Sequence, residues 1–378
     1  MNAVPGAGEK FAPGTGKIVA WDGTGERRRM KRTGEVGRVL RRHQRSGLRI
    51  FWILLFVAVI APRWADVRAQ AVRDTSAIVM RFAGDCLLGA HYEKAAGNDP
   101  SMAFEGFDLF RTADIAVVNL ENPITTRGTK IVKPFNFRMH PRFVPVLTRA
   151  GIGVVSIANN HVFDYGEQGL LDTFSYLDSA GIRYVGAGRT RADAHRPYFF
   201  NRNGRNIAVL AYYGGGEARV ATERKSGVAR RELGAIGADV RALRLADRTM
   251  YIVVILHWGT EKAEAPDAAQ QSFARALIDA GVDAVIGHHP HVLQGIERYR
   301  KGVIAYSLGN FLFGGNGRHT YDTGVFEISL GKAGPEFRFI PVGVRNWHLR
   351  VLSGEDAERV TNKVRGLSSI FPTSMFTH

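Results

Sequence analysis

The sequence predicts an α/β layer fold from about residue 76 onward. Short apolar runs rich in β-branched residues alternate there with amphipathic stretches, which is the pattern of strands and helices that cover one another. With 378 residues and 45% apolar content, the chain is long enough to bury one large core or two ordinary ones. We therefore expect a folded α/β body behind a distinct N-terminal region.

The strands are predicted from the apolar runs, beginning with AIVMRFA. We expect them at 77–83, 114–118, 153–158, 182–185, 207–213, 250–256, 282–286 and 303–307. After residue 324, the runs VFEISL and FRFIPVGV alternate apolar and polar residues, which predicts antiparallel strands near the C-terminus.

Helices are expected in most of the gaps between strands. Apolar residues recur at helical spacing in 167–180 and 267–280, and these segments end at Gly181 and Gly281. The segment 214–245 is charged, Ala-rich and punctuated by glycine, so we expect a surface helix within it. The patterns divide the chain into a basic N-terminal region (1–75), a main domain (76–330), and C-terminal strands with a tail (331–378).

Positive charge is concentrated in the first 73 residues. They hold 15 Lys or Arg against 5 Asp or Glu, and so supply +10 of the net charge of +16. The rest of the chain has 36 basic and 30 acidic side chains, so its composition does not indicate binding to nucleic acid. Contact with the phosphate headgroups of a membrane explains the basic region more simply.

A short apolar run at 50–61, IFWILLFVAVIA, suggests export. It is shorter than the roughly 20 residues that span a bilayer, and it has the length of the apolar part of a signal peptide. A basic flank at 38–49 precedes it, and Ala69-Gln70-Ala71 follows as a cleavage site, with Met30 as an alternative start. An uncleaved anchor extended by 64–67 is the alternative. Both place the body in the periplasm or on the extracytoplasmic face of the inner membrane.

Polar residues that can bind metals follow six of the predicted strands. They are Gly84-Asp85, Asn119-Leu120-Glu121, Asn159-Asn160-His161 with Asp164, His257-Trp258-Gly259, Gly287-His288-His289-Pro290-His291, and Leu308-Gly309-Asn310. Ligands of α/β sheets bind beyond the carboxyl ends of strands, so we expect these residues on one rim. Oxygen and nitrogen donors without a cysteine suit Mn, Fe, Zn or Mg. The single Cys86 allows no internal disulfide and is expected to be a small buried residue.

Each of these residues also has a purely structural explanation. A strand-end His257 can simply be packed, Gly84-Asp85 can form a turn, and Asn159-Asn160 can adopt left-handed turn conformations. Because the turns are independent of one another, their shared ligand chemistry favours a metal or anion site.

The stretch GHHPHVLQG holds three of the chain's 12 histidines within four positions. If the segment is extended, His289 and His291 project on the same face, and Pro290 fixes the backbone between them. We expect these two imidazoles to converge on one or two ions. His288 is expected to point the other way, as a packed residue or as a support for the ligands.

The motifs also occur in a characteristic order between about residues 77 and 325. They are GD at 84–85, NLENP at 119–123, ANNHVFDYG at 158–166, HWGTE at 257–261, HPH at 289–291 and YSLGNF at 306–311. This series resembles the CapA family of poly-gamma-glutamate capsule synthesis proteins, also called the PgsA type. That family is regarded as a branch of the calcineurin-like metallophosphoesterases. The resemblance implies a four-layer α/β/β/α sandwich with a dinuclear metal centre.

The resemblance also implies roles for individual residues. It implies a metal-ligand set of Asp85, Glu121, Asn160, His257, His289 and His291, and His161 as the acid that protonates the leaving oxygen. We expect contact with substrate or support of the ligands from Asn119, Asn159, Asp164, Glu261, His288 and Asn310. Two positions depart from the phosphoesterase pattern, because Leu87 replaces a histidine and Glu121 replaces an aspartate. One of the two metal positions is therefore expected to be weak, empty or altered.

Three functions remain open at this point. The first is an exported hydrolase or transferase that uses one or two divalent ions in the synthesis, export or anchoring of an anionic capsule polymer, cleaving a phosphoester or a γ-glutamyl amide bond. The second is a non-enzymatic subunit of a membrane capsule-synthesis complex that grips the carboxylates of the polymer. The third is a structural scaffold. The expected partners are polyglutamate or another anionic polymer, the membrane and capsule-synthesis subunits, with no nucleic acid.

Overall fold

The computed structural model describes residues 76–216 and 218–377. The predicted signal peptide or anchor lies outside these residues. None of the helices within the described ranges is long and apolar enough to cross a membrane.

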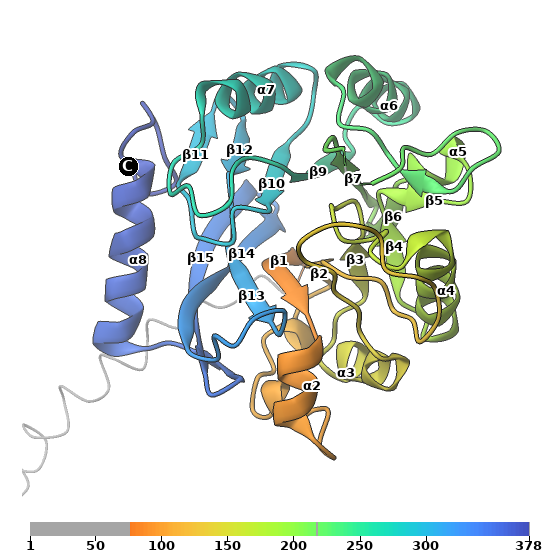
Figure 1. The fold of residues 1–378 in the computed structure, drawn as a ribbon. Coiled ribbons are helices and arrows are strands. Elements are labelled where there is room, and N and C mark those ends of the chain that lie inside the picture. The colour runs from red at the N-terminus through yellow and green to blue at the C-terminus, as the bar shows by residue number, and fades with distance from the viewer. Residues whose placement is uncertain (1–75, 217, 378) are drawn as a thin grey trace, which may run out of the picture. The chain divides into compact units, whose positions relative to one another are not determined.

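Two β-sheets form the centre of the described body (Figure 1). The first has the order β16-β15-β14-β1-β2-β3-β4, with β13 also paired to β1. Its strands are β1 (Ile78–Leu87), β2 (Ile115–Leu120), β3 (Val154–Ser156), β4 (Arg183–Val185), β13 (Asn310–Phe313), β14 (Tyr321–Gly331), β15 (Gly334–Arg345) and β16 (His348–Val351). The run β1-β2-β3-β4 is parallel, and β14, β15 and β16 continue the sheet in antiparallel fashion.

The second sheet has the order β11-β12-β10-β9-β7-β6. It contains β6 (Tyr198–Arg202), β7 (Arg205–Tyr213), β9 (Tyr251–His257), β10 (Ala284–His288), β11 (Ile296–Tyr299) and β12 (Gly302–Ala305). Strands β7, β9, β10 and β12 run parallel, so their carboxyl ends share one edge. A separate pair is formed by β5 (Ala187–Gly188) and β8 (Gly227–Val228).

Side-chain alternation along β7 explains why the second sheet is covered on both faces. Ile207, Val209 and Ala211 belong to the core that this sheet shares with the first sheet. The residues between them, including Leu210 and Tyr212, belong to a second core with α6 (Leu233–Ala246) and α7 (Ala268–Asp279). A strand buried on both faces is apolar at successive positions, which is why these strands are recognisable as continuous runs in the sequence.

Helices on the other side cover the first sheet. Helix α4 (Gly166–Ser179) buries Leu170, Phe174 and Leu177 in the core shared with that sheet, and α3 (Val144–Arg149) and α8 (Gly354–Ser368) also contribute to it. The remaining helical segments are α2 (Ala90–Ala96), α5 (Arg191–Ala194), η1 (Met102–Phe104), η2 (Phe110–Thr112) and η3 (Pro141–Phe143). The layers are thus helix, sheet, sheet and helix, which confirms the predicted α/β/β/α sandwich.

The predicted elements all correspond to elements of the structure. Each predicted strand overlaps an observed one, the surface helix expected within 214–245 is α6, and the antiparallel strands after residue 324 are β14 and β15. Strand β1 is longer than predicted. It passes from antiparallel pairing with β14, which ends at Ala83, to parallel pairing with β13, which begins at Asp85. The small β5–β8 sheet, the short strand β13 and the edge strands β6, β11 and β16 were not predicted.

Candidate metal centre

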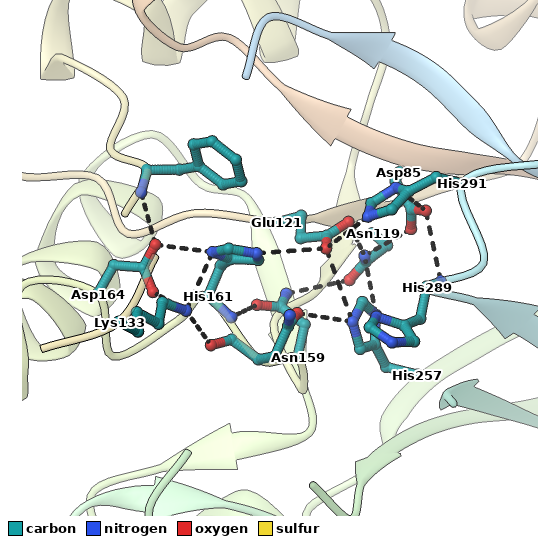
Figure 2. Close-up of polar contacts among 12 residues, drawn as sticks. Asp85, Asn119, Glu121, Lys133, Asn159, His161, Asp164, His257, His289 and His291 are labelled. Atoms are coloured by element: carbon teal, nitrogen blue, oxygen red, sulfur yellow. Dashed lines mark hydrogen bonds and ion pairs between the residues drawn. The ribbon is translucent and has the colours of Figure 1, made fainter. Parts of the chain in front are cut away.

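The two sheets each contribute half of the predicted ligands. Asp85 lies in β1, Glu121 directly follows β2, and Asn160 lies in the turn after β3. His257 ends β9, while His289 and His291 follow β10. Figure 2 shows the carboxylates and imidazoles of this set pointing toward one another. The carboxyl ends of the parallel strands of both sheets therefore meet at one place, as in other α/β ligand sites.

Asp85 is positioned by a close approach of two backbones. A Cβ atom at Gly84 would lie 1.8 Å from the carbonyl oxygen of Gly309, so only glycine fits there. The backbone N–H of Asp85 donates to the same oxygen at 2.8 Å. The Asp85 carboxylate accepts from Asn119 Nδ2 at 2.8 Å, and its other oxygen lies 3.1 Å from His291 Nδ1.

Glu121 has an oxygen that is buried without a hydrogen-bond partner among the described residues. This Oε1 atom lies 3.7 Å from His257 Nε2, 3.6 Å from His291 Nε2 and 4.0 Å from His161 Nε2. An unsatisfied buried carboxylate oxygen is unfavourable unless a positive charge compensates it. A divalent cation bound between Glu121 Oε1 and these imidazoles would compensate the charge of this oxygen.

His257 is oriented by two asparagine side chains. Its Nε2 atom lies 2.8 Å from Asn160 Oδ1, and its Nδ1 atom lies 3.3 Å from Asn119 Nδ2. Asn159 supports this arrangement indirectly, because its amide donates to Asn119 Oδ1 at 3.1 Å and to the Leu120 carbonyl at 2.8 Å. Asn119 thus contacts two of the predicted ligands, Asp85 and His257, and Asn159 contacts Asn119.

The segment around Pro290 is bent, so the prediction of an extended segment is wrong. His289 and His291 both have positive φ angles, 98° and 58°, which the side-chain alternation of a strand does not describe. Tertiary contacts hold the bend: His289 N–H lies 3.4 Å from Asp85 Oδ2, and His291 Nδ1 lies 2.8 Å from Asn310 Oδ1. The two imidazoles are still neighbours, with ring centroids 6.0 Å apart.

Three overlapping groups of side chains can each hold a cation. They are Glu121–His257–His289, Asp85–Glu121–His291 and Glu261–His289–His291, and within each the ligand atoms lie within 4.8 Å of one another. Glu121 is common to the first two groups. Nitrogen and carboxylate ligands bind divalent ions at about 2.0–2.2 Å, so atoms around one ion are separated by up to about 4.4 Å. Together with the unpaired Glu121 oxygen, this donor set fits one or two divalent ions.

The pKa values of the buried ligands are shifted in opposite directions. Burial tends to raise the pKa of Asp85, but the hydrogen bond and charge of His291 hold it below its usual value. Burial and the nearby Asp85 charge raise the pKa of Glu121 well above its usual value. Burial opposes a charged His291, yet Glu121 and Asp85 raise its pKa to about 10. Burial and the neighbouring His289 lower the pKa of His257. Divalent cations compete with these protons, so metal affinity depends on pH.

His161 lies beside the predicted ligands, and contacts at its Nδ1 atom and ring face fix its orientation. Its Nδ1 atom is 2.7 Å from Asp164 Oδ2, and its ring packs on Phe137 with centroids 4.4 Å apart. Lys133 completes the arrangement, because its Nζ atom lies 2.5 Å from Asp164 Oδ1 and 2.8 Å from the Asn160 carbonyl. The sequence analysis did not identify Lys133 or Phe137, because no motif or periodicity marks the loop that carries them.

The remaining predicted residues take different positions. His288 is buried, and its Nε2 atom lies 3.0 Å from the carbonyl oxygen of Ala83. Asn310 supports His291, and the exposed Glu261 belongs to the third ligand group. Cys86 is fully buried, and burial raises the pKa of its thiol to about 12. Leu87, where the phosphoesterase pattern has a histidine, is also fully buried.

The fold and the site define an α/β/β/α sandwich protein with a candidate centre for divalent metals between its two sheets. The chain belongs to the family of bacterial capsule synthesis proteins described as PGA_cap, whose model matches residues 79–315. That match includes all six of the predicted metal ligands.

Curated relatives extend the similarity over most of the chain. The PGA biosynthesis protein CapA of Bacillus subtilis is 31% identical over 328 residues, 83% of this chain and 84% of the relative. The capsule biosynthesis protein CapA of Bacillus anthracis is 30% identical over 296 residues, 73% of this chain and 71% of the relative. A probable polyglutamine synthesis accessory protein of Mycobacterium tuberculosis is 32% identical over 287 residues, 70% of this chain and 75% of the relative.

Solved structures with more distant similarity include two nucleotidases. The NAD nucleotidase of Haemophilus influenzae has a TM-score of 0.46 at 11% identity, over 79% of this chain and 64% of that chain. A putative 5'-nucleotidase of Staphylococcus aureus also has a TM-score of 0.46, at 13% identity, over 77% of this chain and 58% of that chain.

Proposed function

We propose that the protein acts outside the cytoplasm in the synthesis, export or anchoring of an anionic capsule polymer such as poly-gamma-glutamate, through a metal-dependent hydrolase or transferase site. The family and the names of its relatives support the capsule role. The chemistry is supported by the donor set that the two sheets bring together, and the bond acted on is a phosphoester or a γ-glutamyl amide.

The observation that carries the enzymatic proposal is the orientation of His161. Asp164 accepts from Nδ1 at 2.7 Å, which leaves Nε2 directed to the cluster, 4.0 Å from Glu121 Oε1. In its doubly protonated form, a ring held in this way can deliver the proton on Nε2 to a leaving oxygen or nitrogen, while Nδ1–H stays bonded to Asp164. Asp85, Glu121, Asn160, His257, His289 and His291 would hold one or two divalent ions (Mn, Fe, Zn or Mg). A bound ion supplies positive charge that polarises the bond under attack.

A cavity of about 420 Å³ beside the cluster supports contact with an anionic chain. His291 and Asn310 line it together with the cationic side chains of Arg318, Arg359 and Lys363. Arg359 pairs with Asp322, and Lys363 pairs with Glu264. Arg318 forms no ion pair among the described residues and stacks on Tyr321, 5.4 Å from the ring centroid. Arg318 is therefore the side chain in this cavity that is most available to form an ion pair with a carboxylate of the polymer.

The same cavity favours the second candidate function, a polymer-binding subunit of a membrane capsule-synthesis complex. Binding at Arg318 and the neighbouring imidazoles needs no bond cleavage. The two functions share the site and differ only in turnover, so one set of measurements separates them.

The experiment combines metal analysis of the purified full chain with a screen of phosphoester and γ-glutamyl substrates and a binding measurement with poly-gamma-glutamate. We expect bound divalent metal, hydrolysis of one substrate class, and weaker polymer binding in Arg318→Ala but not in Arg248→Ala, which removes an exposed cation after α6. A metal-loaded parent that binds polymer without turnover would establish the binding subunit instead. A parent without metal or polymer binding would refute both functions.

Export is part of this proposal and rests on residues outside the described ranges. The basic flank, the apolar run at 50–61 and Ala69-Gln70-Ala71 motivate it. Residues 30–80 fused to a reporter that is active only outside the cytoplasm should give signal. A silent fusion that accumulates in the cytosol would contradict export.

A further inference from the structure

The loop after β9 brings a third carboxylate to the histidine cluster. Glu261 has a carboxylate oxygen within 4.8 Å of ring nitrogens of both His289 and His291. Glu261 is exposed, whereas Asp85 and Glu121 are fully buried. Glu261 therefore reaches the imidazoles from the solvent side, and the other two carboxylates reach them from the interior.

The backbone holds this loop against the histidine segment at two points. Trp258 N–H donates to the His288 carbonyl at 3.0 Å, and Lys262 N–H donates to the Pro290 carbonyl at 2.8 Å. Between them, Gly259 has a φ of +85°, and a Cβ there would lie 2.6 Å from Gln270 Nε2. The position of Glu261 beside the imidazoles is thus fixed by its chain neighbours and does not depend on the long side chain alone.

The charge of Glu261 is not compensated by a basic side chain. It forms no ion pair with lysine or arginine among the described residues, while Glu264, three positions later, pairs with Lys363 at 2.8 Å. His289, which lies beside Glu261, has a buried Nδ1 atom without a hydrogen-bond partner in the described part of the chain. A cation between them would supply the buried imidazole nitrogen with a partner and the carboxylate with a counter-charge.

We propose that Glu261 is a metal ligand on the solvent side of the centre. The groups Glu121–His257–His289 and Asp85–Glu121–His291 share Glu121, and Glu261 reaches one imidazole of each. If the first two groups each held an ion, Glu121 would be shared between them on the inner side, and Glu261 would lie beside one imidazole of each on the outer side. This inference rests on the metal site of the proposed function and adds a seventh ligand to it.

Counting bound Mn²⁺ in matched variants tests this role. The full chain is loaded with Mn²⁺, and its metal content and electron paramagnetic resonance spectrum are compared with those of Glu261→Gln and Glu264→Gln. Both changes remove one negative charge from an exposed side chain of the same loop. The parent and Glu264→Gln should hold about two ions, with the magnetic coupling expected for ions about 3.5–4 Å apart. Glu261→Gln should hold about one ion and lose the coupling.

Two results would overturn the inference. One is a Glu261→Gln variant with the metal content and coupling of the parent, and the other is a parent that binds a single ion. The readout also separates this inference from the hydrolase proposal. A parent with two ions and no turnover would count against the hydrolase alone. One ion in both the parent and Glu261→Gln, with turnover in the parent, would remove only the ligand role of Glu261.

Discussion

The Nδ1 atom of His161 lies 2.7 Å from Oδ2 of Asp164, and this contact turns the opposite ring nitrogen toward Glu121. His257 and His291 also face Glu121, but their partners differ: His257 Nε2 contacts Asn160 and His291 Nδ1 contacts Asp85, which are both predicted ligands, whereas Asp164 is not. The difference can be measured, because a proton donor and a metal ligand respond differently when they are removed.

His161→Ala should retain bound metal and lose turnover, whereas His291→Ala should lose metal as well. General acid catalysis is worth a factor of about 10² to 10⁴ in rate, so His161→Ala should be slower by that factor. Metal content and hydrolysis are measured together on the parent and both variants. Equal metal loss in the two variants would make His161 a ligand or a structural residue.

Lys133→Met should raise the pKa of His161. Burial lowers this pKa, the bond to Asp164 raises it, and the nearby charge of Lys133 lowers it again. Without that charge the imidazolium is more stable, so a reaction that needs the protonated ring extends to higher pH. The pKa is measured by NMR titration of the His161 ring, and the alkaline limb of the rate profile should move in the same direction. Lys130→Met, in the same loop, is the control. An unchanged His161 pKa would show that Lys133 only holds the loop.

Gly84→Ala should destabilise the protein strongly. The added methyl group would lie 1.8 Å from the Gly309 carbonyl oxygen, so β1 and the turn before β13 must separate. We expect a loss of about 3 kcal/mol or more in the free energy of unfolding, with displacement of Asp85 and weaker metal binding. Gly153→Ala is the control, because a Cβ at Gly153 has nothing within 4 Å. It should change stability by about 1 kcal/mol or less. Similar urea midpoints for both variants would contradict the steric argument.

Asp172→Asn should destabilise the protein at neutral pH but not in acid. Burial raises the pKa of Asp172, but hydrogen bonds from Arg127, Thr125 and Gln168 outweigh burial and lower it below the ordinary value of 3.8. A carboxyl with a depressed folded-state pKa stabilises the fold above its unfolded pKa, and this contribution disappears as the pH falls through the folded value. The free energy of unfolding of the parent should exceed that of the variant by about 1–3 kcal/mol at pH 7, and this difference should shrink as the pH is lowered below 3.8 toward the depressed folded-state pKa. An equal difference in the free energy of unfolding at neutral and acid pH would show that the substitution acts through packing and not through the charge of Asp172.

The ligand positions could be predicted because strand ends are readable in this sequence. Parallel strands such as β9 are buried on both faces and appear as unbroken apolar runs, so the residue that ends the run, His257, stands out. The common direction of neighbouring strands then places Glu121 and Asn160 at one edge of the first sheet, and His257 and His289 at one edge of the second, without any knowledge of the loops. That these two edges face each other does not follow from the strand pattern.

The loop that holds His161 could not be predicted in the same way. Lys133 and Phe137 come from a segment without periodicity, and distant contacts set its path, including Ile131 N–H to the Asp164 carbonyl at 3.1 Å. The bend at His289 has the same origin. Strand alternation is a local rule, and it fails where contacts with Asp85 and Asn310 impose positive φ angles. What the sequence lacks in both cases is information about contacts between remote segments.

Three of the six predicted ligands belong to or follow strands of one sheet and three those of the other, so neither sheet alone provides the complete set. A chain that crosses a membrane unfolded would arrive without an assembled centre and would take up its metal only after the sheets dock. Affinities of nitrogen and oxygen sites for divalent metals follow a general order, so for a given ligand set and geometry the supply of metal at the moment of docking influences which ion is bound. The metal would then be chosen by the compartment in which folding is completed, and a protein folded in the cytosol of an expression host would carry a different ion from one folded outside.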